Sequence, residues 1–208
     1  MWRESLQMAQ VVHIAKRNVR GVERRATILR AAVEVVARGG AGALTHRAVA
    51  AQAGVSLASI TYHFPSVDDL RRATLIYAAD VVGTEFAASF TCGGDERAII
   101  EELAVRWRHI GLTHRGEFSA LFSLLVEALH DPELRSDVDE LIDVPTRMLT
   151  QSGISAATAD ALIGSLIGLA LVALARDEPE SALGQFDAAV AALLEAFGSS
   201  CSPSVRES

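Results

Sequence analysis

The sequence predicts an all-α chain of about nine helices, in which a small helix-turn-helix domain precedes a larger helical domain. Half of the 208 residues are hydrophobic but only 5% are aromatic, and the abundant Ala and Leu favour helices over strands. Apolar residues recur at helical spacing from about residue 24 to near the C-terminus. The third observation is a pair of short helices predicted within residues 45–64.

Three residues of segment 45–64 predict two tightly packed helices. Ala50 is small, so the second helix can cross close to the first. Gly54 can adopt the left-handed backbone that a tight turn needs, and Ile60 fills the angle between the helices. This spacing suits two helices that cross at roughly 90–120°. Such a unit reads DNA by placing its second helix in the major groove.

Capping residues predict where the helices of this domain begin. A first helix is expected over 24–38, before a Gly-Gly stop signal. Thr45 and Ser56 are good N-caps for the two helices of the motif. Ser66 caps the next helix, with Asp69 as its capping-box partner. Three capped helix starts within 22 residues indicate a compact, well-specified unit.

The remaining helices follow from apolar periodicity between glycine and proline breaks. We expect them over 67–90, 95–113, 117–130, 132–151, 156–176 and 180–197. The predicted organisation is an N-terminal arm or leader at 1–22, a DNA-binding domain at 23–70, a larger helical domain at 71–197 and a flexible tail at 198–208. The arm is either mobile or a helical extension, and its basic residues can contact DNA.

The charge is distributed unevenly along the chain. The net charge is −7, which alone argues against a nucleic-acid binder. Residues 1–72, however, hold 11 Lys and Arg against 5 Asp and Glu, whereas the rest hold 8 against 21. A basic front and an acidic remainder indicate that only the front faces phosphate.

Cysteine use and apolar runs predict a cytoplasmic protein without a membrane partner. Cys92 and Cys201 make neither a disulfide framework nor a metal-ligand cluster, which fits a reducing compartment. Residues 1–22 carry no signal-peptide pattern. The apolar run 161–175 is shorter than the ~20 residues that span a bilayer and predicts a buried helix. We expect no cofactor and no bound metal.

A set of residues in the front of the chain matches a known family pattern. These residues are Ile28, Leu29, Ala31, Ala32, 39–42, Thr45, Val49, Ala50, 53–56, 62–64, Ser66, Asp69 and Leu70. They cover roughly 24–70 and resemble the tetracycline-repressor (TetR) family of bacterial transcriptional regulators. Val67 departs from the pattern, because the family often has a phosphate-binding Lys there. The resemblance implies a homodimeric DNA-binding regulator whose part 71–197 binds effectors and dimerises.

The second helix of the motif is expected to present small and polar side chains to DNA, since Val55 and Ile60 must face inward. The candidate DNA contacts are Thr45, Arg47, Ser56, Leu57, Ala58, Ser59, Thr61, Tyr62 and His63. Tyr62 and His63 are placed to reach phosphate. No Lys or Arg lies on this helix, so bidentate guanine contacts must come from Arg47 or the arm. One such helix makes few contacts, which favours a dimer on a palindromic operator.

Helix 67–90 is the expected coupling element. Its N-terminus, capped by Ser66, offers backbone N–H groups to phosphate. It begins beside the DNA-binding unit and ends in the acidic half, about 36 Å away. A small-molecule effector that moved its far end would reorient the reading helices.

The dimer and effector sites are expected in the second domain. The last two helices, 156–176 and 180–197, are the predicted dimer surface, because Gly164 and Gly168 permit close helix approach; the alternative is an internal core helix. Candidate effector contacts are Phe86, Trp107, His109, Phe118, Phe122, Leu125, Glu127 and Arg147. Each of them also suits an ordinary core or surface position.

Rival functions find less support in the sequence. The chain has no glycine-rich phosphate loop, nucleophile elbow or spaced carboxylate pair, so we do not expect an enzyme. The expected function is a repressor that an effector releases from its operator. The alternatives are an architectural or cell-division DNA-binding protein without a ligand, and an activator.

Overall fold

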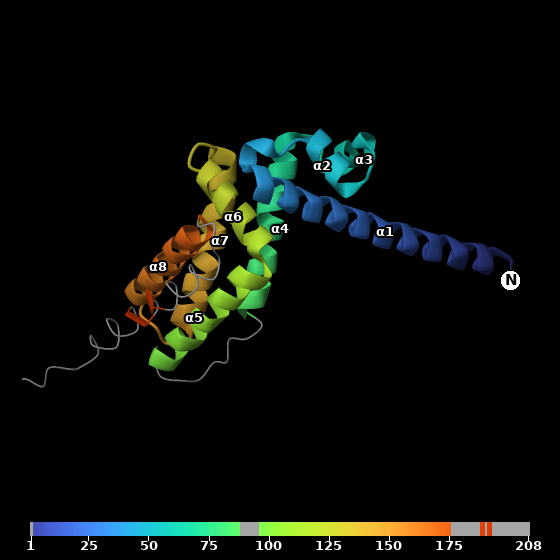
Figure 1. Ribbon diagram of the computed structural model, residues 1–208. Coiled ribbons are helices and arrows are strands. Elements are labelled where there is room, and N and C mark those ends of the chain that lie inside the picture. The colour runs from blue at the N-terminus through green and yellow to red at the C-terminus, as the bar shows by residue number, and fades with distance from the viewer. Residues whose placement is uncertain (1, 88–95, 176–187, 190, 193–208) are drawn as a thin grey trace, which may run out of the picture.

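A computed structural model describes residues 2–87, 96–175, 188–189 and 191–192 of the chain. Within these residues the fold is entirely helical, as predicted. Its elements are α1 (Trp2–Gly39), η1 (Ala41–Ala43), α2 (His46–Ala53), α3 (Leu57–His63), α4 (Val67–Ala87), α5 (Glu96–Thr113), α6 (Arg115–Glu127), α7 (Pro132–Gln151) and α8 (Ala156–Leu174). The last part of α1, together with α2 and α3, forms a head above a bundle of α4 to α8 (Figure 1).

Most helix boundaries lie close to the predicted ones. α7 spans the predicted residues, because Asp131 caps its start and the chain turns at Gly153, where φ is 97°. α6 begins at Arg115, before the glycine that was expected to break the chain there. The predicted helix 180–197 falls outside the described residues, apart from short helical stretches at 188–189 and 191–192.

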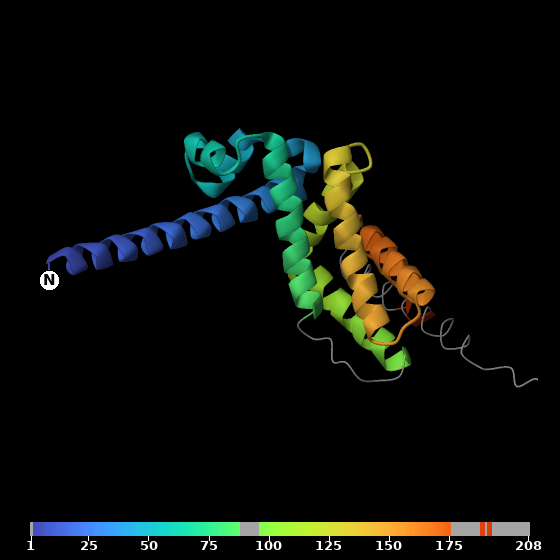
Figure 2. The same cartoon turned by 180° about the vertical axis from the view of Figure 1, so that it is seen from behind.

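The first helix is longer than the predicted 24–38. α1 starts at Trp2, so the described residues 2–22 form a helical extension of the predicted first helix, which is one of the two expected alternatives. Both views show it projecting away from the bundle (Figure 2). Its last four turns carry the buried residues Ile28, Leu29, Ala32 and Val36, which pack in the core of the head.

Two hydrophobic clusters hold the molecule together, and α4 contributes to both. The head cluster joins Val49, Ile60 and Phe64 to Leu70 and Leu75 of α4, and it continues into α6 and α7. The lower cluster joins Val82 and Phe86 of α4 to residues of α5, α6, α7 and α8. α4 accordingly packs against α1, α5, α6 and α7.

Helix α8 is buried on one face only. Ala159, Leu162 and Leu166 are in the lower cluster, whereas Leu171 and Val172 are 41% and 52% exposed. The expectation of a fully buried helix is therefore wrong for the single chain. The helix is long and apolar enough to cross a membrane by length and composition alone, but it packs against α5, α6 and α7.

Gly54 ends α2 in the left-handed conformation, with φ 64° and ψ 35°. A Cβ added there would meet no atom within 4 Å, so any cost of Gly54→Ala comes from the backbone. We expect this substitution to lower the free energy of unfolding by about 1 kcal/mol, measured by urea denaturation. Gly42→Ala is the control, because its Cβ also has free space and its φ is not positive. Equal stability of the two variants would contradict this explanation.

Candidate nucleic-acid interface and effector pocket

The two helices of the motif are held by local hydrogen bonds. Thr45 Oγ1 accepts the backbone N–H of Ala48 at 3.1 Å, and Ser56 Oγ accepts that of Ser59 at 3.2 Å. The N–H of Val55 donates to Ala50 O at 3.0 Å, across the turn. Both cap side chains are thus committed to their helix starts, which leaves base or phosphate contact as a second role for Thr45 and Ser56.

Packing decides which face of α3 is available. Ile60 is fully buried and Ala50 is 8% exposed, as their proposed structural roles require. Leu57 and Tyr62 are 43% and 83% exposed. Ala58 and Thr61 are also exposed, whereas Ser59 and His63 are half-buried. Most of the predicted contact residues are therefore accessible to solvent.

The exposed side of α3, with Leu57, Ala58 and Thr61, has few free hydrogen-bonding groups. The Thr61 hydroxyl lies 3.3 Å from Leu57 O and 3.2 Å from Ala58 O, to which it can donate. With its proton used inside the helix, it offers a methyl group and an acceptor to DNA. Arg47, on α2, is exposed and is the basic residue of the motif itself. Arg25 of α1 stacks over the Phe64 ring at 5.2 Å, and so lies beside the end of α3.

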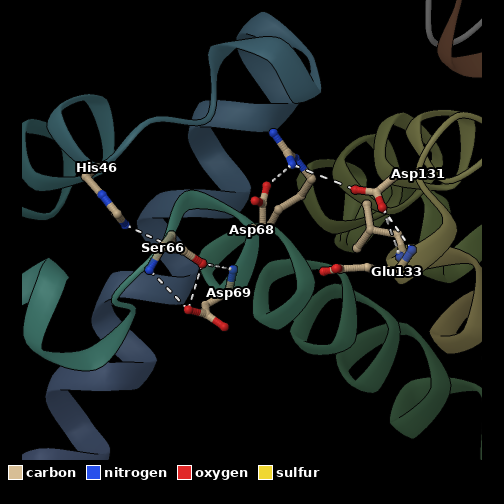
Figure 3. Close-up of polar contacts among 8 residues, drawn as sticks. His46, Ser66, Asp68, Asp69, Asp131 and Glu133 are labelled. Carbon is tan, nitrogen blue, oxygen red and sulfur yellow. Dashed lines mark hydrogen bonds and ion pairs between the residues drawn. The ribbon is translucent and has the colours of Figure 1, made fainter.

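The start of α4 is tied to the motif by a polar network (Figure 3). Asp69 Oδ2 accepts both the Ser66 hydroxyl at 2.7 Å and the Ser66 backbone N–H at 3.1 Å. Ser66 Oγ accepts the Asp69 N–H at 2.9 Å, which completes the predicted capping box. His46 Nε2 lies 3.1 Å from Ser66 O and links α2 to this turn. The two Ser66 hydrogen bonds lower the pKa of the Asp69 carboxyl.

This network argues against a phosphate site at the start of α4. Asp68 and Asp69 both lie in the first turn, and an ionised carboxylate already caps this N-terminus. A phosphate placed there would be repelled by the Asp69 carboxylate, whereas the charge of Asp68 is compensated by Arg71 at 2.5 Å. Phosphate binding by the remaining N–H groups stays a prediction, which the carboxylate at the start of α4 opposes.

A cavity of about 380 Å³ lies in the bundle. Five of the eight predicted effector residues line it: Phe86, Trp107, Phe118, Phe122 and Leu125. The aromatic rings pack edge to face in a row, with centroid separations of 6.1, 5.3 and 5.4 Å. Trp107 Nε1–H donates to Leu166 O at 3.1 Å, which fixes the indole and leaves its carbon atoms for the cavity.

Three predicted effector residues do not line the cavity. His109 is exposed on α5, because it lies two positions from Trp107 and so on another face of the helix. Glu127 is half-buried at the end of α6. Arg147 is exposed, 3.7 Å from Asp143 on its own helix. These three assignments are corrected by the structure.

The lining residues that the sequence analysis missed come mainly from α4, α7 and α8. They are Ile76, Ala79, Asp80, Val82, Gly83, Thr84, Ala87, Leu121, Leu141, Val144, Pro145, Met148, Ile163 and Ile167. Those of α4 recur every three to four positions, so this periodicity could have identified one face of α4 as a wall of the pocket.

A second hollow of about 430 Å³ lies between α1, the end of α3 and α4, and it shares Ile76 and Asp80 with the pocket.

Two family models match this chain. Residues 28–74 match the bacterial regulatory proteins of the tetR family, and residues 95–199 match the tetracyclin repressor-like C-terminal domain. The chain belongs to the TetR family. It is therefore a DNA-binding transcriptional regulator, and its family consists of regulators rather than enzymes.

Several TetR-family structures resemble the whole fold. A member from Streptomyces coelicolor A3 is 32% identical, with a TM-score of 0.72 over 83% of this chain and 97% of that one. The multidrug binding protein EbrR in complex with ethidium is also 32% identical, with a TM-score of 0.68 over 83% and 97%. EbrR in complex with imidazole has a TM-score of 0.67 at 32% identity, over 83% and 89%.

A curated relative matches a shorter stretch. The HTH-type transcriptional dual regulator CecR of Shigella flexneri is 34% identical over 95 residues, which is 42% of each chain. The chain thus spans about two fifths of that relative.

Tyr62 provides a direct test of the TetR-family DNA interface. Its ring is 83% exposed, so Tyr62→Ala should leave the unfolding temperature unchanged. We expect it to weaken binding to all DNA sequences alike by about tenfold, the value of one hydrogen bond to a charged group. Fluorescence anisotropy with two unrelated duplexes measures this effect, and Tyr62→Phe separates the hydroxyl from the ring. Loss of preference at a single base pair would refute a phosphate contact.

Proposed function

We propose that the protein is a dimeric, cytoplasmic, sequence-specific repressor that releases a palindromic operator when a small molecule enters the α4–α8 pocket. The observation that carries this proposal is the continuity of α4. Its first turns pack in the core of the head, and its last turns line the pocket. A ligand there contacts the same helix that positions the motif.

The exposed residues of the motif support the DNA-binding step. In this proposal α3 enters the major groove with Leu57, Ala58, Ser59 and Thr61 toward the bases. Thr45, Arg47, Ser56, Tyr62 and His63 then contact the flanking backbone, and Arg47 or the helical arm 1–22 supplies any guanine contact. Because each head offers few strong base contacts, specificity requires two heads on a two-fold site.

The exposed face of α8 supports the dimer. It presents Ala157, Ala161, Gly164 and Gly168 in one row that ends at Leu171, and all five are exposed in the single chain. These positions recur at spacings of three and four, so they share one side of the helix. Small residues allow two backbones to approach closely, which suits the four-helix seam predicted with segment 180–197, most of which lies outside the described residues.

The pocket supports a small aromatic effector. Four aromatic side chains and a volume of about 380 Å³ suit a molecule of two or three fused rings. The similar protein EbrR forms complexes with ethidium and proflavin, which makes compounds of this size reasonable first ligands. A filled core would have favoured an architectural protein on the same fold.

Activation is the second candidate. The curated relative CecR is a dual regulator, and binding physics does not set the sign of regulation, since the position of the operator decides it.

The direct test is selection of bound duplexes from a random pool by the full chain, followed by a salt titration. We expect a palindromic consensus, a dimer at micromolar concentration, and a log–log salt slope of about 0.9 per neutralised phosphate. Release of the selected duplex by ethidium or proflavin would support the effector step. A stable monomer, or binding that does not vary with salt, would contradict the proposal.

Two ion pairs join α4 to α7 and extend the proposed coupling. Arg72 binds Asp137 in a bidentate pair, with Nε–Oδ2 and Nη2–Oδ1 distances of 2.7 Å. Asp137 raises the pKa of this guanidinium further. Arg71 lies 2.5 Å from Asp68 and 3.9 Å from Asp131, the N-cap of α7. Because α7 also lines the pocket, a ligand that shifts α7 pulls on the start of α4.

Breaking this link should separate ligand binding from operator release. We expect Arg72→Ala to keep ligand affinity within about twofold but to raise the ligand concentration needed for release severalfold, on the scale of mutations in a coupling network. Operator binding with and without ligand, measured by anisotropy, tests this. Arg147→Ala is the control, because the ion pair of Arg147 with Asp143 lies within α7. The exchange Arg72→Asp with Asp137→Arg should restore release; unchanged release in Arg72→Ala would contradict the link.

A further inference from the structure

We propose that the pocket selects aromatic cations over neutral and anionic molecules, and that Asp80 is the residue that sets this selectivity. The inference rests on the proposed effector role of the pocket and adds the charge of the ligand. Asp80 lies on α4, in the stretch that passes from the head to the lower cluster, and lines the pocket directly.

The described wall of the pocket carries a single ionisable group. Among the described residues that line it, Asp80 is the one ionisable side chain, and Thr84 is the one uncharged side chain with a hydroxyl. No Lys, Arg or His is among the described residues of the wall. An anionic ligand would lose its hydration there without gaining a counter-charge, which is costly in an apolar site. The sign of the charge at the wall therefore excludes carboxylates and phosphates as ligands.

Asp80 has no ion-pair or hydrogen-bond partner for its side chain among the described residues. Neighbouring acids on α4 and α7 are engaged: Asp68 with Arg71, Glu85 with His114, Asp137 with Arg72 and Asp143 with Arg147. No ion pair or side-chain hydrogen bond to a described residue involves Asp80. Its side chain is exposed at the wall shared by the pocket and the second hollow. A carboxylate left unpaired at this boundary can face a bound cation without first breaking another contact.

Four aromatic side chains contribute to the remaining wall. Phe86, Trp107, Phe118 and Phe122 surround the cavity, and the faces of such rings attract positive charge within about 6 Å. A fused-ring cation with delocalised charge suits this wall best, because it stacks on the rings and is weakly hydrated. A compact ammonium ion would lose more hydration for the same gain.

Matched ligands and variants test the proposal by isothermal titration calorimetry on the full chain at pH 8. The ligands are 9-aminoacridine, a cation at this pH, acridine, its neutral analogue, and acridine-9-carboxylate, an anion. We expect the wild type to bind the cation most tightly and the anion least. Asp80→Asn should weaken 9-aminoacridine binding about fivefold, as for a partly exposed ion pair, and leave acridine unchanged.

Two further variants separate charge from shape and from long-range fields. Asp80→Glu keeps the charge and should keep the preference for the cation. Asp143→Asn removes the same charge from α7 at a position outside the pocket wall, and should change neither affinity. Equal binding of cation and neutral analogue by the wild type, failure to bind either, or equal losses for both in Asp80→Asn would overturn the proposal.

Charge selection by Asp80 and the effector role of the pocket can fail separately. Binding of 9-aminoacridine with the expected dependence on Asp80, but without release of operator DNA, would refute the effector role and support charge selection. Release of operator DNA by 9-aminoacridine and by acridine at equal concentrations would support the effector role and refute charge selection.

Discussion

The packing of a single helix into two cores is the constraint on which the rest of the structure depends. Leu70 and Leu75 place the start of α4 in the core of the head, and Val82 and Phe86 place its end in the core of the bundle. Since packed interiors transmit displacement rather than absorb it, neither core can shift along α4 without affecting the other. The capping box at Ser66 and the Arg72–Asp137 pair reinforce the same end of this helix.

The motif could be predicted from the sequence because its determinants are local. Thr45, Ser56 and Ser66 cap helices through contacts three residues away, and Gly54 meets a backbone requirement of its own turn. For the same reason the bounds of α7 could be predicted from Asp131, which caps its start, and from Gly153, which follows its end. The family match at 28–74 falls on this same region.

The ion pairs, the pocket lining and the exposed face of α8 depend on contacts between residues far apart in the sequence. The periodicity of apolar residues does not predict such contacts. Arg72 and Asp137 are 65 positions apart, and their pairing requires knowing that α4 and α7 lie side by side. His109 was expected in the pocket because of its chemistry, but the phase of α5 turns it to solvent. The exposed face of α8 could not be predicted either, because the helix is apolar on all sides. Only its packing against α5, α6 and α7 distinguishes the buried face from the exposed one.

Hydrogen exchange along α4 is the most direct test of the coupling between the two cores and needs no ligand. Gly83 lines the pocket, and a Cβ there meets no atom within 4 Å, so Gly83→Leu fills the cavity from within, with Gly83→Ala as the control for helix propensity. If α4 couples the two cores, Gly83→Leu changes exchange at the start of α4, around 67–75, as well as near residue 83. A change confined to the turns beside residue 83 would contradict the account.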